Sequence, residues 1–169
     1  MKHYYVLLPC AHGLRIHVMP LAPIVLVIDE NPRDAHLLHE AFVEAHVPVH
    51  VESIQTGTDA VCRIQGWGPR FAARKRPDLV LIELRLPKLD GTEVLAFIKG
   101  QTRHRTIPTL MFSSSLPERV QADCRALGAD ACLEKPDAFV GFGSVVETIL
   151  DHLAHRCDDS NVTLHLPDV

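Results

Sequence analysis

From residue 24 onward, short runs of apolar residues alternate along the chain with amphipathic segments. Continuous apolar runs predict buried strands, and apolar residues three or four positions apart predict helices. The expected strands are residues 24–28, 49–54, 79–82, 107–112 and 131–133. The expected helices contain residues 32–46, 60–64, 94–98, 120–127 and 139–153. The chain therefore alternates strands and helices throughout its central part.

The strands are apolar on both faces, and a helix separates each from the next. This pattern predicts an α/β fold with a doubly wound five-stranded parallel sheet in the order 2-1-3-4-5, covered by helices on both sides. Residues 23–155 are expected to form this domain. Residues 1–22 are expected to be an N-terminal extension outside the core, with Met19 as an alternative translation start. Residues 156–169 are expected to be a polar tail.

The composition narrows the functional classes. A chain of 169 residues fits one ordinary domain, and a net charge of -4 offers no general attraction to nucleic acid or to an anionic membrane. No apolar run approaches the roughly 20 residues that span a bilayer. Five dispersed cysteines without CxxC spacing indicate reduced thiols in a cytoplasmic protein.

Polar side chains follow directly after four of the predicted strands. Asp29 and Glu30 follow the first strand, Glu83 the third, Ser113 the fourth and Lys135 the fifth. Ligands of an open parallel sheet bind beyond the carboxyl ends of its strands, so these residues are expected to converge. A single polar residue in such a position usually only begins a loop, but a set of five indicates a site.

Three carboxylates in one place raise one another's pKa unless a cation compensates them. An oxygen-only cluster with positions left for water suits Mg²⁺. Lysine adds a second positive charge, and serine adds a hydrogen bond. Together these groups can stabilise a phosphoryl group during transfer.

With this set of residues the chain resembles the receiver domains of two-component signalling, which have a flavodoxin-like fold. The matching stretches are VLVIDENPRD, PDLVLIELRLPKLDG, IPTLMFSSS and LGADACLEKP, in the family's order and spacing. The stretches DENPRDAHLL and RLPKLDGTEVLAFIK are similar to the phytochrome-associated single-domain subfamily. The resemblance implies a response regulator in phosphorelay signal transduction, with a histidine kinase as partner and a bacteriophytochrome as a candidate.

The resemblance also implies roles for individual residues. Asp29 and Glu30 match the acidic pair that holds Mg²⁺, and Arg85 matches a residue whose backbone carbonyl is a further ligand. Ser113 matches the hydroxyl that follows the phosphoryl group, and Lys135 matches the lysine that pairs with it. The bond between Lys135 and Pro136 matches one that is cis in receivers.

Two residues depart from the family pattern. Glu83 occupies the phosphoacceptor position, where the family has aspartate and where the acceptor also serves as a metal ligand. The extra methylene moves the carboxylate by ~1.5 Å, and in-line transfer tolerates misplacement poorly. Cys132 stands where receivers commonly have a rotating Tyr or Phe, and a small thiol cannot report the position of Ser113 in that way. Cys132 is expected to be a core residue, with redox sensing as the alternative.

Three interpretations of Glu83 remain open: a working mimic of the phosphorylated state, an inert substitution, or an engineered change. The leading function is an interaction module that is constitutively biased or independent of phosphorylation. The alternatives are a conventional phosphoacceptor for a histidine kinase and a Mg²⁺-dependent phosphatase-like enzyme. The enzyme is disfavoured, because such enzymes need a second aspartate two residues after the nucleophile, where Arg85 stands.

Two surfaces have candidate partners. The fifth helix has more apolar residues than one core face requires, so part of its stripe is expected to be exposed and to form a homodimer with the fourth helix and fifth strand. That stripe consists of Phe139, Phe142, Val145, Val146, Ile149, Leu150 and Leu153. The basic loop Arg70–Arg76 is expected to be solvated, with docking of an acidic partner as the alternative.

Overall fold

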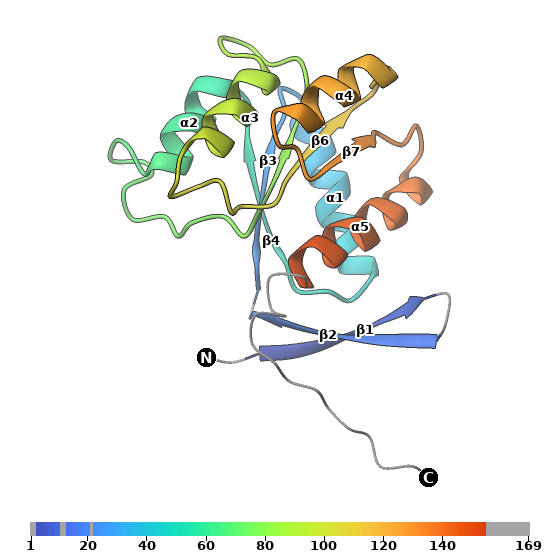
Figure 1. Ribbon diagram of the computed structural model, residues 1–169. Coiled ribbons are helices and arrows are strands. Elements are labelled where there is room, and N and C mark those ends of the chain that lie inside the picture. The colour runs from blue at the N-terminus through green and yellow to red at the C-terminus, as the bar shows by residue number, and fades with distance from the viewer. Residues whose placement is uncertain (1–2, 11–12, 21, 155–169) are drawn as a thin grey trace.

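A computed structural model describes residues 3–10, 13–20 and 22–154 of the chain. Its centre is a parallel five-stranded sheet with the strand order β4-β3-β5-β6-β7 (Figure 1). This confirms the predicted doubly wound sheet, in which the second strand in sequence lies at the edge, beside the first. The strands are β3 (Ile24–Ile28), β4 (His50–Ile54), β5 (Leu79–Ile82), β6 (Thr109–Ser113) and β7 (Ala131–Glu134).

Helices cover both faces of this sheet and divide the core into two layers. On one side α1 and α5 pack with Val25, Val27 and other residues of the sheet. On the opposite side α2, α3 and α4 pack with Leu26, Ile28 and their neighbours. The helices are α1 (Pro32–Glu44), α2 (Gly57–Gln65), α3 (Gly91–Gly100), α4 (Glu118–Ala126) and α5 (Phe142–Ala154), and a 3₁₀ turn, η1 (Phe139–Gly141), precedes α5.

Local sequence fixes where several helices begin. Asn31 caps α1 by accepting a hydrogen bond from the backbone N–H of Arg33, and Pro32 occupies the first turn, where its missing N–H is not needed. Thr56 caps α2 through the N–H of Asp59. These caps start α1 and α2 soon after the carboxyl ends of β3 and β4.

The first strands of the chain form a separate hairpin. β1 (His3–Cys10) and β2 (Gly13–Pro20) pair antiparallel in a two-stranded sheet that is not part of the five-stranded one. β2 lies beside α5 (Figure 1). The sequence did not predict a hairpin in this extension. The proposed polar tail, 156–169, lies outside the described residues.

The apolar stripe predicted around the fifth helix is partly exposed, as expected, but only at Phe139, which precedes α5. The stripe residues within α5 are all buried: Phe142, Val145, Val146, Ile149, Leu150 and Leu153. The reason is that α5 packs against α1 as well as against the sheet, so it needs a wider apolar face than a helix with one neighbour. The exposed apolar residues of this region lie in η1, where Phe139 is 38% and Val140 is 88% exposed.

Every peptide bond of the described residues is trans, so the expected cis bond between Lys135 and Pro136 is not present. Among the helices of the described residues, none has the length and apolar character needed to cross a membrane.

Candidate functional site

The sheet delivers the predicted polar residues to one edge. The backbone N–H groups of Asp29 and Glu83 donate hydrogen bonds of 2.9 Å to the carbonyls of Ile54 and Ile28 on the neighbouring strands. Lys135 N–H likewise donates to the carbonyl of Ser113 at 3.0 Å. These bonds continue the parallel ladder by one residue beyond the strands, so the residues that follow the strands lie side by side, as the sequence predicts.

Glu83 is the centre of the site, and both of its carboxylate oxygens have partners. Oε1 accepts hydrogen bonds from the Ser113 hydroxyl at 2.5 Å and from the backbone N–H groups of Leu84 and Arg85 at 2.6 and 3.3 Å. Oε2 forms an ion pair with Lys135 Nζ at 2.6 Å. Since the Glu83 side chain is buried, these contacts replace the water that it loses on folding.

Lys135 lies among three carboxylates. Its Nζ is 2.5 Å from Asp29 Oδ2, 2.6 Å from Glu83 Oε2 and 2.9 Å from Asp34 Oδ2. Burial by itself would lower the pKa of Lys135, but the hydrogen bonds to these carboxylates outweigh it and raise the pKa above the ordinary lysine value. The ammonium is therefore charged across the whole physiological pH range.

Asp29 is the most deeply buried acid of the site, at 1% exposure. Desolvation raises its pKa, and this effect is opposed by the hydrogen bond from Lys135 and by the N–H of Asn31, which donates to Oδ1 at 2.9 Å. Both oxygens of Asp29 therefore already have donors.

Asp34 belongs to the site although the sequence interpretation did not select it. It lies in the first turn of α1, and its carboxylate accepts a 2.9 Å hydrogen bond from Lys135. The start of α1 follows Asp29 closely, so an acid in its first turn is carried to the same sheet edge. That position within DENPRD was the available indication.

The side chains of two other predicted metal ligands lie at the surface. Glu30 is exposed, and so is the side chain of Arg85. The backbone of Arg85 takes part through its N–H group, which donates to Glu83, whereas the sequence predicted a role for its carbonyl.

The acidic side chains of the site converge on the lysine ammonium and not on a position for a divalent cation. Within the described residues, no group of three His, Cys, Asp or Glu side chains is placed to hold a metal ion. The oxygens of Asp29 and Glu83 are directed to Lys135, Ser113 and backbone N–H groups instead. The lysine ammonium supplies the positive charge that the sequence assigned to Mg²⁺.

Gly91 supports the position of Glu83. The N–H of Gly91 donates to the carbonyl of Leu84 at 3.0 Å, which folds the segment after β5 back over the end of this strand. A Cβ at residue 91 would lie 2.1 Å from the backbone carbonyl oxygen of Glu83. Only glycine allows this approach.

Cys132 lies on β7, half-buried against the core layer of α2, α3 and α4. Burial raises the pKa of its thiol and that of the neighbouring Cys124. Both sulfurs are therefore protonated and weakly reactive at neutral pH, which favours the core interpretation over redox sensing.

Comparisons with known proteins identify the family of this domain. The family model for the response regulator receiver domain matches residues 25–140. Among curated proteins, the chain is 30% identical over 131 residues to FilR2 of Methanothrix harundinacea, described as a probable methanogenesis regulatory protein. This match covers 76% of the chain and 82% of FilR2.

Two solved structures are also similar. The phosphorylated cyanobacterial phytochrome response regulator RcpA has a TM-score of 0.71 at 28% identity, covering 87% of this chain and 99% of RcpA. The Mn²⁺-bound form of the response regulator Rcp1, a Synechocystis protein, has a TM-score of 0.70 at 25% identity, covering 85% of this chain and 99% of Rcp1. The chain's relatives thus include phytochrome-associated regulators, as its sequence predicts, and one of them binds a divalent metal.

The five-stranded sheet, the polar cluster at its carboxyl edge and these matches lead to one assignment. The chain belongs to the response regulator receiver domain family of two-component signalling, and is a signalling domain rather than an enzyme.

Proposed function

We propose that this chain is a single-domain response regulator whose output does not depend on phosphorylation, because Glu83 acts in place of a phosphorylated aspartate. The observation that carries this proposal is the engagement of Glu83 with both Ser113 and Lys135. In the receiver family these two positions contact the phosphoryl group. Here one carboxylate contacts both of them.

The extra methylene of glutamate gives this arrangement its reach. Aspartate would end ~1.5 Å nearer to β5, so a phosphoryl group would be needed to span the remaining distance to the hydroxyl and the ammonium. The carboxylate of Glu83 already supplies a negative charge and two acceptor oxygens at that place. The backbone N–H groups of Leu84 and Arg85 donate hydrogen bonds to this carboxylate and hold it there.

A conventional phosphoacceptor is the competing function. It requires an acceptor oxygen that is free to attack a phosphoryl group in line. Neither oxygen of Glu83 is free in this sense, since Oε1 has three donors and Oε2 is paired with Lys135. This occupation disfavours phosphorylation of Glu83.

The partners follow from the same assignment. A histidine kinase is the family's partner, and the likeness to the phytochrome response regulator RcpA supports a bacteriophytochrome as the candidate. We further propose a cytoplasmic homodimer formed through α4, β7 and the α5 end that carries η1. The exposed Phe139 and Val140 support this surface.

Intact mass measured after exposure to Mg²⁺ and a small acyl phosphate tests the proposal. We expect no phosphoryl addition on the unaltered chain and a clear addition on the Glu83→Asp variant. A phosphoryl addition on the unaltered chain that is absent from Glu83→Gln would reject the proposal, because Glu83 would then be a working acceptor.

Amide NMR spectra separate a working mimic from an inert substitution. The resonances around Ser113 and Lys135 in the unaltered chain should resemble those of phosphorylated Glu83→Asp and should move in Glu83→Ala. If the unaltered chain instead resembles unphosphorylated Glu83→Asp, Glu83 is an inert substitution.

A further inference from the structure

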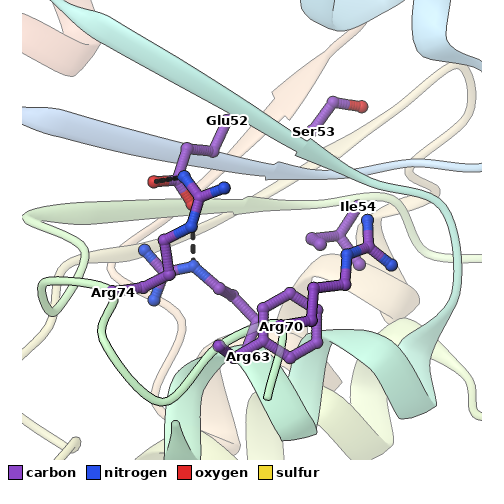
Figure 2. A pocket seen from close by; sticks show the side chains of 7 residues that line it. Glu52, Ser53, Ile54, Arg63, Arg70 and Arg74 are labelled. Carbon is purple, nitrogen blue, oxygen red and sulfur yellow. Dashed lines mark hydrogen bonds and ion pairs between the residues drawn. The ribbon is translucent and has the colours of Figure 1, made fainter. Parts of the chain in front are cut away.

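A polar hollow lies beside the edge strand β4, and none of its lining side chains belongs to the Glu83 cluster. Its volume is about 200 Å³, and its lining comes from β4, α2 and the loop 66–77 (Figure 2). The lining residues are Glu52, Ser53, Ile54, Arg63, Arg70, Phe71 and Arg74. Three arginines and a single acid give this small space two net positive charges, although the whole chain is negative.

Arg63 and Glu52 form the fixed base of the hollow. Arg63 is 2% exposed, and its Nε donates to Glu52 Oε2 at 2.7 Å. Its Nη2 also donates to the carbonyl of Lys75 at 2.8 Å, which ties the loop 66–77 to α2. The only acid in the lining, Glu52, is shared between Arg63 and Arg74, so one carboxylate faces three guanidinium groups.

Arg70 and Arg74 lie beside the Arg63–Glu52 pair, and Arg74 forms a long ion pair with the same Glu52 carboxylate. The Arg70 guanidinium lies over the Phe71 ring, 5.0 Å from its centroid, and Arg74 Nη1 is 3.6 Å from Glu52 Oε1, beyond hydrogen-bond distance. In the described part of the chain, neither guanidinium has a hydrogen-bond acceptor. Guanidinium groups present several donors in a fixed plane and match oxyanions.

We propose that this hollow binds a compact dianion of the phosphate class. The space is smaller than the roughly 300–1,000 Å³ of typical small-molecule pockets, so a single charged group fits it better than a larger ligand. Phosphate concentrates two negative charges on one centre and so matches the excess of two positive charges in this small space, whereas a dicarboxylate separates its charges. The excess positive charge of the lining favours an anion of this kind.

This inference does not depend on the proposed role of Glu83, since no residue of the hollow belongs to that site. The proposed anion site would also account for the charge of the loop 66–77, which has four basic residues and no acid. The loop's basic residues are Arg70, Arg74, Lys75 and Arg76.

The test is a titration of the ¹⁵N-labelled full chain with inorganic phosphate at constant ionic strength, followed by amide NMR. We expect saturable shifts at residues 52–54, 63 and 70–74. The Arg70→Gln/Arg74→Gln variant should bind phosphate about tenfold more weakly or worse, since it loses charge-assisted hydrogen bonds. Both arginines are exposed, so the variant should retain the spectrum of the folded chain elsewhere.

The Arg103→Gln/Arg119→Gln variant is the matched control, because it removes two exposed arginines outside the hollow. It should bind phosphate as the unaltered chain does. If both variants bind phosphate equally weakly, the binding is general charge attraction and the proposal is overturned. Shifts that do not saturate, or that lie outside the hollow, would also overturn it. Succinate at the same ionic strength should bind more weakly, and equal binding would overturn the phosphate class.

Discussion

Lys135 donates a 2.9 Å hydrogen bond to Asp34, which joins the residue after β7 to the first turn of α1. The same ammonium contacts Asp29 and Glu83, so it links one helix with the ends of two strands. A lysine side chain is long and has many rotamers, and three acceptors in different directions leave it one position. Asp34 therefore positions the group that holds Glu83.

Replacing Asp34 should show this positioning. We expect Asp34→Asn to lower the free energy of unfolding by about 1 kcal/mol, because a charge-assisted bond becomes a weaker one. Urea denaturation measures this loss. Asp137→Asn, at an exposed acid, is the control and should change stability little. Equal losses in both variants would show that overall charge, not the contact with Lys135, is responsible.

Removing Lys135 should make the acidic site a better metal site. In Lys135→Met, Asp29, Asp34 and Glu83 lose their shared cation, and a divalent ion can compensate them. We expect Mg²⁺ to raise the melting temperature of this variant clearly, but to raise that of the unaltered chain only at about millimolar concentrations or above. Adding Glu30→Gln to Lys135→Met should reduce the effect if Glu30 is a ligand. No gain from Mg²⁺ in Lys135→Met would contradict the prediction.

His104 should make stability depend on pH. It is 3% exposed, and its Nδ1 has no hydrogen-bond partner in the described structure. Burial, followed by the nearby charges of Arg103 and Arg76, lowers its pKa below the ordinary 6.5. The unfolded chain therefore binds the proton more readily, so the contribution of His104 is complete above about pH 6.5 and declines as the pH falls below it.

Urea denaturation between about pH 7.5 and 5 measures this dependence. The slope of stability against pH should be smaller in His104→Leu than in the unaltered chain. His39→Gln, at an exposed histidine, should leave the slope unchanged. An identical slope in His104→Leu would show that other groups cause the pH dependence.

Gly91 should tolerate no side chain. A Cβ there would meet the carbonyl oxygen of Glu83 at 2.1 Å, so Gly91→Ala should cost roughly 1–3 kcal/mol through displacement of the backbone. The matched control is Gly143→Ala in α5, where a Cβ meets nothing within 4 Å. That variant should be neutral or stabilising, since alanine favours helix. The difference in melting temperature between the two variants is the measurement.

The proposed dimer should depend on η1. Val140 is 88% exposed, so Val140→Asp should shift the association to higher concentration without unfolding the chain. Val43→Asp makes the same chemical change at a 60% exposed position on α1 and should leave the association unchanged. Sedimentation velocity across a concentration series measures both. If the unaltered chain stays monomeric at high concentration, the proposed dimer is rejected.

The sequence predicted the sheet and the principal site because both depend on local patterns. Apolar runs located the strands, and the rule that parallel strands end at one edge brought Asp29, Glu83, Ser113 and Lys135 together. The contact of Asp34 could not be predicted in this way, since it depends on where Lys135 directs its ammonium.

Burial of charged residues was also beyond the sequence pattern. Arg63 interrupts the apolar face of α2 and would be assigned to solvent by its type, yet it is buried. The ion pair with Glu52, on a strand brought alongside by the fold, makes this burial possible. The sequence singled out the basic loop Arg70–Arg76, but not the hollow beside β4, because Arg63 and Glu52 join that loop only in the folded chain.

The covalent attachment of the Glu83 carboxylate has a consequence for timing. A phosphoryl group is added and later lost by hydrolysis, so it gives a receiver a reversible memory of an earlier stimulus. A carboxylate cannot be hydrolysed away from its own chain, and under the proposed function each molecule keeps the same state from folding to degradation. The strength of such an output would follow the number of molecules in the cell, which moves control from the kinase to gene expression and proteolysis.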